Sequence, residues 1–379
     1  MATLYLHIGH GKTGTSWIQS VLRLSSAELK KHGILYAIGP DHNISDPNKI
    51  TSGNAVSLLA SRQSFESILE NCHPADNASL LFSSENLFGH FVRNNAEDFI
   101  DEVALKNGFD RVEILLFIRN PVSFAVSVWQ QKIKRHGDHH ISLENFNENE
   151  ADLRYEIFSL VEQFMEKIKK CELISLTVLN YSNCKDNLIN YLASWLKVPV
   201  EILTIPSGKR VNRSMTYAEL MLQKELNRIL GQSGHLLSDP LCEKLTEIEP
   251  DIIIPQLSVQ KEMWAKIQPI VERLNRILPV EHRYQCDIQT PLPVPEQLCF
   301  SHEQVKVIAE NLGNEIKRLQ NEADDANQRV VSLSNEIEYM KSNAAYFYGA
   351  LKVSDAMLFI LKRLKWKIKK IKILILWVR

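Results

Sequence analysis

The sequence has few cysteines, almost no net charge and no apolar segment of signal-peptide length at its start. The six cysteines are far apart and form no C-x-x-C pair, which argues against a disulfide framework or zinc site and favours a reducing compartment. A net charge of −1 gives no sign of nucleic-acid binding by the chain as a whole. Without a basic segment and an apolar stretch at the N-terminus, we expect a cytoplasmic protein.

What is present is typical of a globular chain. Hydrophobic residues make up 45% and charged residues 23%, which excludes global disorder, a collagen-like repeat and a polytopic membrane protein. A length of 379 residues fits two or three structural units. We expect an α/β domain over 1–290 with a mainly helical part at about 214–280, then a coiled coil over 300–351 and a basic amphipathic tail over 352–379.

The first 200 residues alternate between two patterns. Short apolar runs that stop at polar residues predict strands buried on both faces of a parallel sheet, at Thr3–Ile8, Ser79–Ser84, Val112–Ile118 and Leu173–Leu179. Amphipathic helical patterns lie between and after them, at Thr15–Lys31, Ala96–Lys106, Val122–Arg135, Glu156–Lys170 and Asn187–Leu196. The alternation predicts βαβ units, and ligands of such sheets bind at the carboxyl ends of the strands.

A heptad pattern follows a proline-rich segment. The apolar positions alternate spacings of four and three, which predicts a coiled coil and self-association; they are Val305, Ala309, Leu312, Ile316, Leu319, Ala323, Ala326, Val330, Leu333, Ile337, Met340, Ala344, Phe347 and Leu351. The alternative is one amphipathic helix lying on the α/β domain. The tail 352–379 holds nine lysines and arginines against one acidic residue, and its apolar stripe suits an anionic membrane surface. Its alternatives are a continued coiled coil or a disordered basic tail.

A glycine-rich segment follows the first predicted strand and leads into a helix. Backbone N–H groups of Gly11, Gly14 and their neighbours would face an anion there, assisted by the helix dipole. Lys12 adds a positive charge, and the hydroxyl groups of Thr13, Thr15 and Ser16 add donors and are expected to cap the helix. The ligand that suits this chemistry is a phosphate, and the fold we expect is a P-loop-like parallel sheet flanked by helices. The alternative is a glycine-rich turn without a ligand.

The loop departs from the nucleoside triphosphate loop G-x-x-x-x-G-K-[ST], because Leu6 stands where its first glycine should be. The segment Leu-His-Ile-Gly-His-Gly-Lys-Thr-Gly-Thr-Ser-Trp-Ile-Gln instead resembles the 5′-phosphosulfate loop of sulfotransferases that use 3′-phosphoadenosine 5′-phosphosulfate (PAPS). A second segment, Ile118–Ser127, is similar to the 3′-phosphate element of that family. Arg119 ends a strand, Pro121 starts a helix, and Ser127 lies nearly two turns into it, so that an arginine fork and a hydroxyl could hold one phosphate.

A third segment, Gly208–Ser214, resembles the late basic segment of this family, which lies near the 3′-phosphate and adenine; its matching residues are Arg210 and Asn212. A solvated basic loop is the alternative. The resemblance covers about residues 1–230 and implies a PAPS-dependent sulfotransferase. It implies that Lys12 stabilises charge on the leaving phosphate and that Glu85, in Ser-Ser-Glu after the Ser79–Ser84 strand, is the catalytic base.

Other assignments remain open. His7 and His10 are alternative bases, and Glu85 could instead complement a helix dipole. His136, His139 and His140 have no cysteine or carboxylate at metal-binding spacing, so we expect no metal. The acceptor is expected to offer a hydroxyl, or alternatively an amine, of a glycan or glycolipid precursor held near the inner membrane. The competing functions are a magnesium- and ATP-dependent small-molecule kinase and a non-catalytic coiled-coil scaffold.

Overall fold

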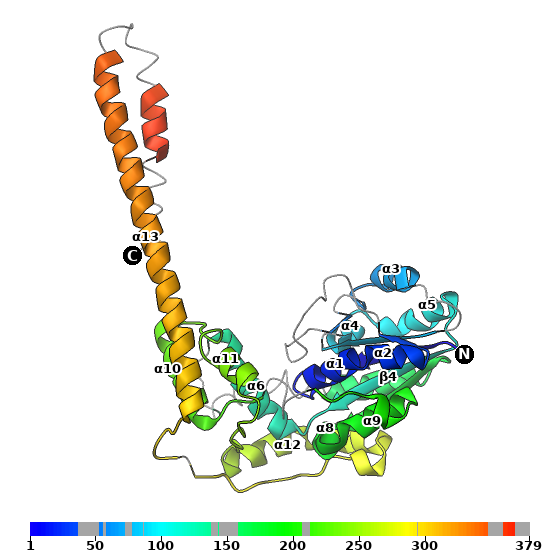
Figure 1. The fold of residues 1–379 in the computed structure, drawn as a ribbon. Helices are drawn as coiled ribbons and strands as arrows, with labels where there is room; N and C mark the ends of the chain where they lie inside the picture. The colour runs from blue at the N-terminus through cyan, green and yellow to red at the C-terminus, as the bar shows by residue number, and fades with distance from the viewer. Residues whose placement is uncertain are drawn as a thin grey trace. The chain divides into compact units, whose positions relative to one another are not determined.

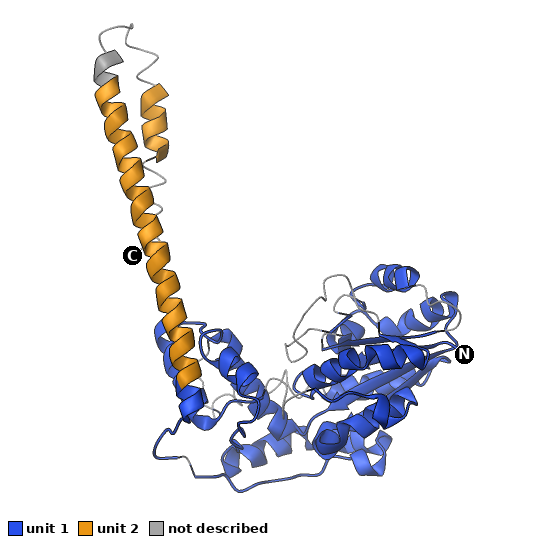
Figure 2. Ribbon diagram, in the orientation of Figure 1, with its two compact units in different colours: residues 1–305 blue, residues 306–379 orange. Residues whose placement is uncertain are grey.

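The computed structural model describes residues 1–36, 53–55, 58–72, 78–85, 87–137, 143, 158–206, 213–293, 295–347 and 359–367, with the backbone alone for 344–347. The chain divides into two compact units, residues 1–305 and 306–379 (Figure 2). The first unit contains the sheet and most of the helices (Figure 1). The second contains most of one long helix and a shorter helical segment at 359–367.

Five parallel strands form the sheet in the order β2-β3-β1-β4-β5. Their bounds are Thr3–Ile8 for β1, Ile34–Tyr36 for β2, Ser79–Ser84 for β3, Arg111–Ile118 for β4 and Ile174–Asn180 for β5. The predicted parallel sheet flanked by helices is therefore confirmed, and the four predicted strands end within one residue of their observed ends. The fifth, β2, was not expected, because three residues are too few to show a periodicity.

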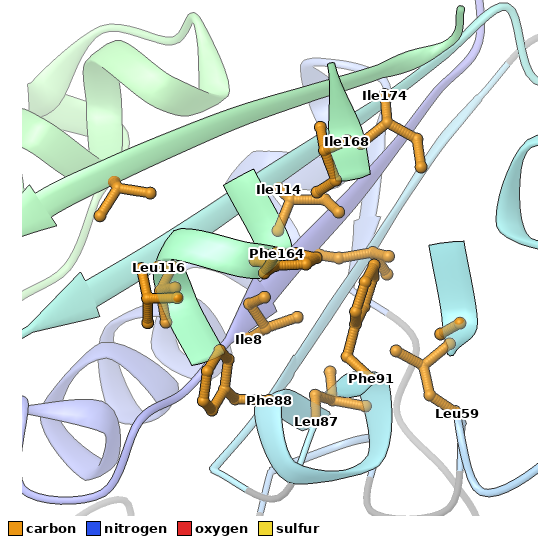
Figure 3. Packing of buried hydrophobic residues seen from close by; sticks show 14 of the residues in the cluster. Ile8, Leu59, Leu87, Phe88, Phe91, Ile114, Leu116, Phe164, Ile168 and Ile174 are labelled. Atoms are coloured by element: carbon orange, nitrogen blue, oxygen red, sulfur yellow. The ribbon is translucent and has the colours of Figure 1, made fainter. Parts of the chain in front are cut away.

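The sheet is buried on both faces because most side chains of its central strands are apolar, and two of the buried polar ones, His7 of β1 and Ser83 of β3, hydrogen-bond to each other. Leu4, Leu6 and Ile8 of β1 pack into one hydrophobic cluster, and Tyr5 packs into another on the opposite face. Alternation along a strand sends successive side chains to opposite faces, so a continuous apolar run supplies both clusters. Figure 3 shows the first cluster, where Ile8 lies among residues of the neighbouring helices.

Helices cover both faces (Figure 1). The Tyr5 face carries α1 (Thr15–Leu24), α2 (Ser26–Lys31) and α9 (Leu188–Leu196), while the Ile8 face carries α3 (Arg62–Cys72), α4 (Leu87–Arg93), α5 (Ile100–Lys106), the helical segment 158–168 and α12 (Leu257–Ile277). Two predicted helices are each divided in two. The helix expected at Thr15–Lys31 breaks at Ser25, and the one expected at Ala96–Lys106 begins with a 3₁₀ turn at Ala96–Asp98.

The part of the chain after residue 214 is mainly helical: α10 (Tyr217–Leu230), α11 (Ser238–Lys244) and α12 follow one another. Its interior holds a buried ion pair. Arg213 is 3% exposed and donates two hydrogen bonds to the carboxylate of Glu219, at 2.7 and 2.6 Å. Glu219 also accepts from Thr216 N and Gln304 Nε2, so both charges are fully paired. This network ties α10 to the start of α13 (His302–Phe347) within the first unit.

The long C-terminal helix expected from the heptads is present as α13, which runs without a break for 46 residues. In the second unit the 359–367 helix lies beside it, joined by an ion pair between Lys367 and Glu336 (Figure 2). No helix within the described ranges is long and apolar enough to cross a membrane. Of the predicted tail, 352–358 and 368–379 lie outside the described residues, and so does Leu351 of the heptad stripe.

Candidate functional site

Polar residues follow three neighbouring strands at the carboxyl edge of the sheet. Strand β1 lies between β3 and β4, and Ile8 pairs in register with Ser84. Glu85 therefore comes directly after β3, the glycine-rich loop after β1 and Arg119 after β4. Ligands of open parallel sheets bind at this edge, so the fold brings the three predicted segments to the place where a site is expected.

Two glycines of the loop are required by crowding. A Cβ on Gly9 would lie 2.8 Å from Glu85 Cα and 2.9 Å from Thr15 Cγ2, so only glycine lets β1 turn between β3 and α1. Gly14 has φ 75°, and a Cβ there would lie 3.0 Å from the ring of Tyr181. The loop is therefore tight against the end of β3 and against Tyr181, which follows β5.

The expected capping of α1 by hydroxyl side chains is wrong. The N-cap is Gly14, and no side chain caps the helix. Thr13 Oγ1 instead donates to the carbonyl of His10, and Thr15 Oγ1 is buried without a hydrogen-bond partner. Because the loop turns tightly, these side chains point along the loop rather than at the first helical N–H groups. The N-terminus of α1 thus keeps its anion-binding N–H groups uncapped by side chains.

Lys12 lies at the tip of the loop with its side chain partly buried and a left-handed backbone, φ 67°. Its Nζ donates to Gln131 Oε1 at 2.6 Å. Burial lowers the pKa of Lys12 from 10.5 to about 8, although the nearby charge of Glu85 acts to raise it. A positive charge held out of water in this way gains strongly from a bound anion.

Arg119 is partly buried, and its guanidinium reaches the same loop. Its Nη1 donates to the carbonyl of Lys12 at 3.2 Å and its Nε donates to Ser123 Oγ at 3.0 Å. The guanidinium also stands 5.9 Å from the ring centre of Tyr181. Burial lowers the pKa of Arg119. Ser127, the predicted partner of the arginine, lies one turn further along α6 (Pro121–His136) and lines the same cavity.

Neither cation has a carboxylate partner among the residues that the structure describes. Within the described ranges, no ion pair is formed by Lys12 or by Arg119, although both are withdrawn from solvent. Charged groups in such positions are normally paired, and an unpaired one is costly. Two unpaired cations linked through one backbone carbonyl therefore indicate a site for an anion with more than one charged group.

Glu85 is exposed and lies over the loop: its Oε1 is 3.0 Å from where a Gly11 Cβ would be. The alternative bases are placed differently. His7 and His10 are buried, 0% and 4% exposed, and burial lowers the pKa of each to about 3. His7 Nδ1 pairs with Ser83 Oγ at 2.7 Å. Both imidazoles are packed side chains outside the lining of the cavity, whereas Glu85 lines it.

A cavity of about 1640 Å³ joins these residues. Of the predicted site residues it is lined by Lys12, Gly14, Thr15, Ser16, Glu85, Arg119 and Ser127. Gly11 and Thr13 lie in the loop but not on the cavity wall, and Arg210 and Asn212 lie outside the described residues. Residues within segments 250–255 and 280–289 also line the cavity, and no role was predicted for them from the sequence.

Three residues of the site were not predicted from the sequence: Ser123, Gln131 and Tyr181. Ser123, Ser127 and Gln131 are spaced by four along α6, so all three share one face of the helix. That spacing could have revealed Ser123 and Gln131 as partners of Arg119 and Lys12. Tyr181 has no such signal, because its place beside Gly14 depends on β5 following β4 in the sheet.

No group of metal-ligating side chains is found within the described residues. His136 is the last residue of α6, while His139 and His140 lie outside the described residues. Comparison with protein-family models, curated proteins and solved structures finds no match for this chain.

Proposed function

We propose that this protein transfers a sulfuryl group from PAPS to a hydroxyl, or alternatively an amine, of an acceptor. One observation carries the proposal: Lys12 and Arg119 are partly buried, have no carboxylate partner among the described residues, and meet through the Lys12 carbonyl. PAPS has an anionic group at each end of its ribose, a 3′-phosphate and a 5′-phosphosulfate. It could therefore satisfy both cations at once.

The donor atoms of the site suit such a molecule. The uncapped N-terminus of α1, the Lys12 ammonium and the unpartnered Thr15 hydroxyl would hold the 5′-phosphosulfate. The Arg119 guanidinium, with Ser127 on the same cavity wall, would hold the 3′-phosphate. The cavity of about 1640 Å³ exceeds the roughly 300–1,000 Å³ of an ordinary ligand pocket, which leaves room for an acceptor beside the donor.

The chemistry assigns one task to each side chain. The acceptor oxygen forms a bond to sulfur as the bond between sulfur and the bridging phosphate oxygen breaks, and that oxygen keeps the electron pair. Lys12 would stabilise the charge that develops there, which is larger in the transition state than before it. Glu85, exposed in the cavity and over the loop, would accept the acceptor proton.

The kinase alternative is disfavoured by the start of the loop. Leu6, which replaces the first glycine of the triphosphate loop, is fully buried in the middle of β1. The strand continues to Ile8, so the loop has no backbone available to surround a triphosphate chain. The non-catalytic scaffold is the second alternative, and it differs from the enzyme only in lacking turnover.

A thermal-shift titration separates the sulfotransferase from the kinase. We expect 3′-phosphoadenosine 5′-phosphate to stabilise the protein, by about 2.7 kcal/mol at 100 times its Kd, and ATP with Mg²⁺ to do much less. Adenosine 5′-phosphate lacks the 3′-phosphate, so comparing it with the bisphosphate isolates the contribution of that group to binding. The variant Arg119→Gln should weaken the bisphosphate at least tenfold and leave the monophosphate nearly unchanged. Stronger stabilisation by ATP with Mg²⁺ than by the bisphosphate would refute the proposal.

The base is tested separately with Glu85→Gln, which keeps the shape of the side chain. We expect turnover to fall by about 10²–10⁴-fold while the bisphosphate still stabilises the variant as it does the parent. Full activity of this variant would remove Glu85 from the mechanism without affecting the donor site.

The acceptor class rests on the basic tail alone. A glycan or glycolipid precursor held at an anionic membrane is the acceptor that a basic amphipathic segment at 352–379 favours. Full-length protein should therefore co-sediment with vesicles containing anionic lipid and sulfate such acceptors faster than a chain ending at residue 351. If the full-length protein and the shortened chain sedimented equally with the vesicles and sulfated these acceptors at equal rates, a membrane-held acceptor would be refuted.

A further inference from the structure

The apolar stripe of α13 has no cover along much of its length. Among the described side chains from 308 to 343, none is buried. Ile316 is 57% exposed and Leu319 is 49% exposed, although both belong to the heptad stripe. A helix of this length gains its stability from burying one face rather than from helix propensity, so this stripe requires a partner.

The residue types along the stripe identify the number of strands. In heptad positions a and d, the larger a residues are Ile316, Val330 and Ile337, all β-branched. Leucine is the commonest larger d residue, at Leu312, Leu319 and Leu333, and the others are Val305, Met340 and Phe347. β-branched residues at a with leucine at d favour two parallel strands over three or four.

The flanking charges favour the same arrangement. In a parallel pair each g residue faces the e residue five positions later in the other copy. Glu336 then faces Lys341, and Glu315, Glu322 and Arg329 face uncharged side chains. An antiparallel pair with full overlap would set Glu315 against Glu336 and Lys306 against Lys341, two like-charge contacts, beside one opposite-charge contact between Glu322 and Arg329. We infer that two copies of this chain pair in parallel and in register through the α13 stripe.

The alternative cover is the 359–367 helix of the same chain. Lys367 forms an ion pair with Glu336, which is a g residue, so this helix could compete with Lys341 of a second copy for that carboxylate. Even with this helix in place, Ile316 and Leu319 keep about half of their surface exposed. The intrachain helix therefore does not complete the cover of the stripe, whereas a second α13 would match it residue by residue.

The first test is the molar mass of the full-length chain, measured by light scattering and sedimentation equilibrium. We expect twice the mass of one chain. The variant Ile316→Asp with Leu319→Asp should halve that mass. Its matched control, Val331→Asp with Tyr339→Asp, adds the same charge at two exposed apolar residues outside the stripe and should remain dimeric. A monomeric or trimeric parent, or a stripe variant that stays dimeric, would overturn the inference.

Orientation is tested by cysteine cross-linking in the full-length chain. Leu319→Cys places a thiol at a d position, where the two copies face each other in a parallel, in-register pair. We expect this variant to form a covalent dimer under mild oxidation, and Val331→Cys and the parent chain to form none through α13. The parent controls for the exposed native thiols of Cys286 and Cys299. A dimer of unchanged mass in which Leu319→Cys fails to cross-link would refute the parallel arrangement.

Helix content gives a second readout of pairing. Because pairing stabilises the helix, far-ultraviolet circular dichroism should show less helix in the stripe variant than in its control, and the control should match the parent at the same concentration. Stabilisation by 3′-phosphoadenosine 5′-phosphate should be equal in both, because the substituted residues lie in the second unit and the donor cavity in the first. The pairing does not depend on the proposed function, and either can fail without the other.

Discussion

Two regions of the first unit hold arginines in opposite circumstances. Arg213 is enclosed by protein, and its guanidinium meets the carboxylate of Glu219 through two hydrogen bonds. Arg119, at the edge of the sheet, donates to two neutral oxygens, those of Ser123 and of the Lys12 carbonyl, and forms no ion pair with any described residue. The same side chain is thus neutralised within the fold in one place and left with its charge unbalanced in the other.

The pKa values of the two arginines shift in opposite directions. Burial acts to lower the pKa of Arg213, but the hydrogen bonds and charge of Glu219 outweigh it, and the pKa is raised. Burial lowers the pKa of Arg119 without a carboxylate to oppose it. A cation with its counter-ion supplied by the protein contributes to the fold. A cation without one lowers stability until an anion arrives, and that cost is typical of a functional site.

The largest effect expected from this comparison is on activity. Lys12→Met keeps the length of the side chain and removes the charge, so sulfuryl transfer should fall by at least about 10³-fold. The free energy of unfolding at pH 7 should rise rather than fall, by about 1–3 kcal/mol, because an unpaired, desolvated charge is lost. Radiolabelled sulfuryl transfer and denaturant unfolding measure the two quantities.

Lys31→Met is the control for Lys12→Met. Lys31 is an exposed lysine whose partner is Glu28 at 2.7 Å, and we expect no change in transfer and a change below about 0.5 kcal/mol in stability. If Lys12→Met lowered the free energy of unfolding instead of raising it, Lys12 would be a structural residue like Arg213. The contrast between the paired and the unpaired cation would then fail.

The second effect is on stability alone. Glu219→Gln leaves the buried Arg213 without its counter-ion, and we expect a loss of about 3–5 kcal/mol in the free energy of unfolding. Bisphosphate binding at a temperature where the variant is folded should be retained. Urea unfolding measures the first quantity and a titration the second, with Glu28→Gln at the exposed pair as the control. A stable Glu219→Gln protein would contradict the structural role of this pair.

The sequence predicted the strand ends of the site but not how they come together. The apolar runs of β1 and β3 stop at Gly9 and Glu85, and this is a local signal that the sequence carries directly. That β1 lies between β3 and β4 is not local. Long-range packing decides it, and only this order brings Arg119 to the Lys12 carbonyl.

For α6, the sequence-based prediction considered one pair of residues, Arg119 and Ser127. The family resemblance directed attention to Arg119 and Ser127, whereas the arginine bonds to Ser123, four residues along the chain. A guanidinium that leaves a strand end reaches the first turn of the following helix most easily. The capping of α1 was misjudged for a similar reason, because hydroxyl residues favour N-caps on average, but the crowded turn here places Gly14 at that position.

The third effect concerns pH, and the two regions should respond in opposite ranges. Burial lowers the pKa of Lys12 to about 8, so its proton is lost as the pH rises through 8, and kcat/KM should fall about tenfold per pH unit above it. Stability should rise between about 8 and 10.5, because there the unfolded chain binds the extra proton. A flat kcat/KM profile up to pH 10 would remove Lys12 from the rate.

Glu219 gives the opposite response. Although burial acts to raise it, hydrogen bonds from Arg213 and Gln304 lower the pKa of Glu219 below its ordinary 4.5. Its contribution to stability is therefore present above pH 4.5 and is lost as the pH falls below that value toward the native pKa. Unfolding free energies of the parent and of Glu219→Gln, measured from pH 6 to pH 3, should converge as this happens. A constant difference across that range would show that the carboxylate charge is not what stabilises the pair.

The smallest expected effect is on bisphosphate binding, and it distinguishes two serines near Arg119. Ser123 accepts a hydrogen bond from Arg119, whereas Ser127 lines the cavity without one. Ser123→Ala and Ser127→Ala should each weaken the bisphosphate about three- to tenfold. Only the first should lose its effect when Arg119→Gln is already present, because Ser123 acts by orienting the guanidinium and Ser127 by contacting the phosphate. Calorimetric titration of the three single and two double variants measures this coupling. Equal additivity for both serines would mean that the Ser123 hydrogen bond does not orient Arg119 for its ligand.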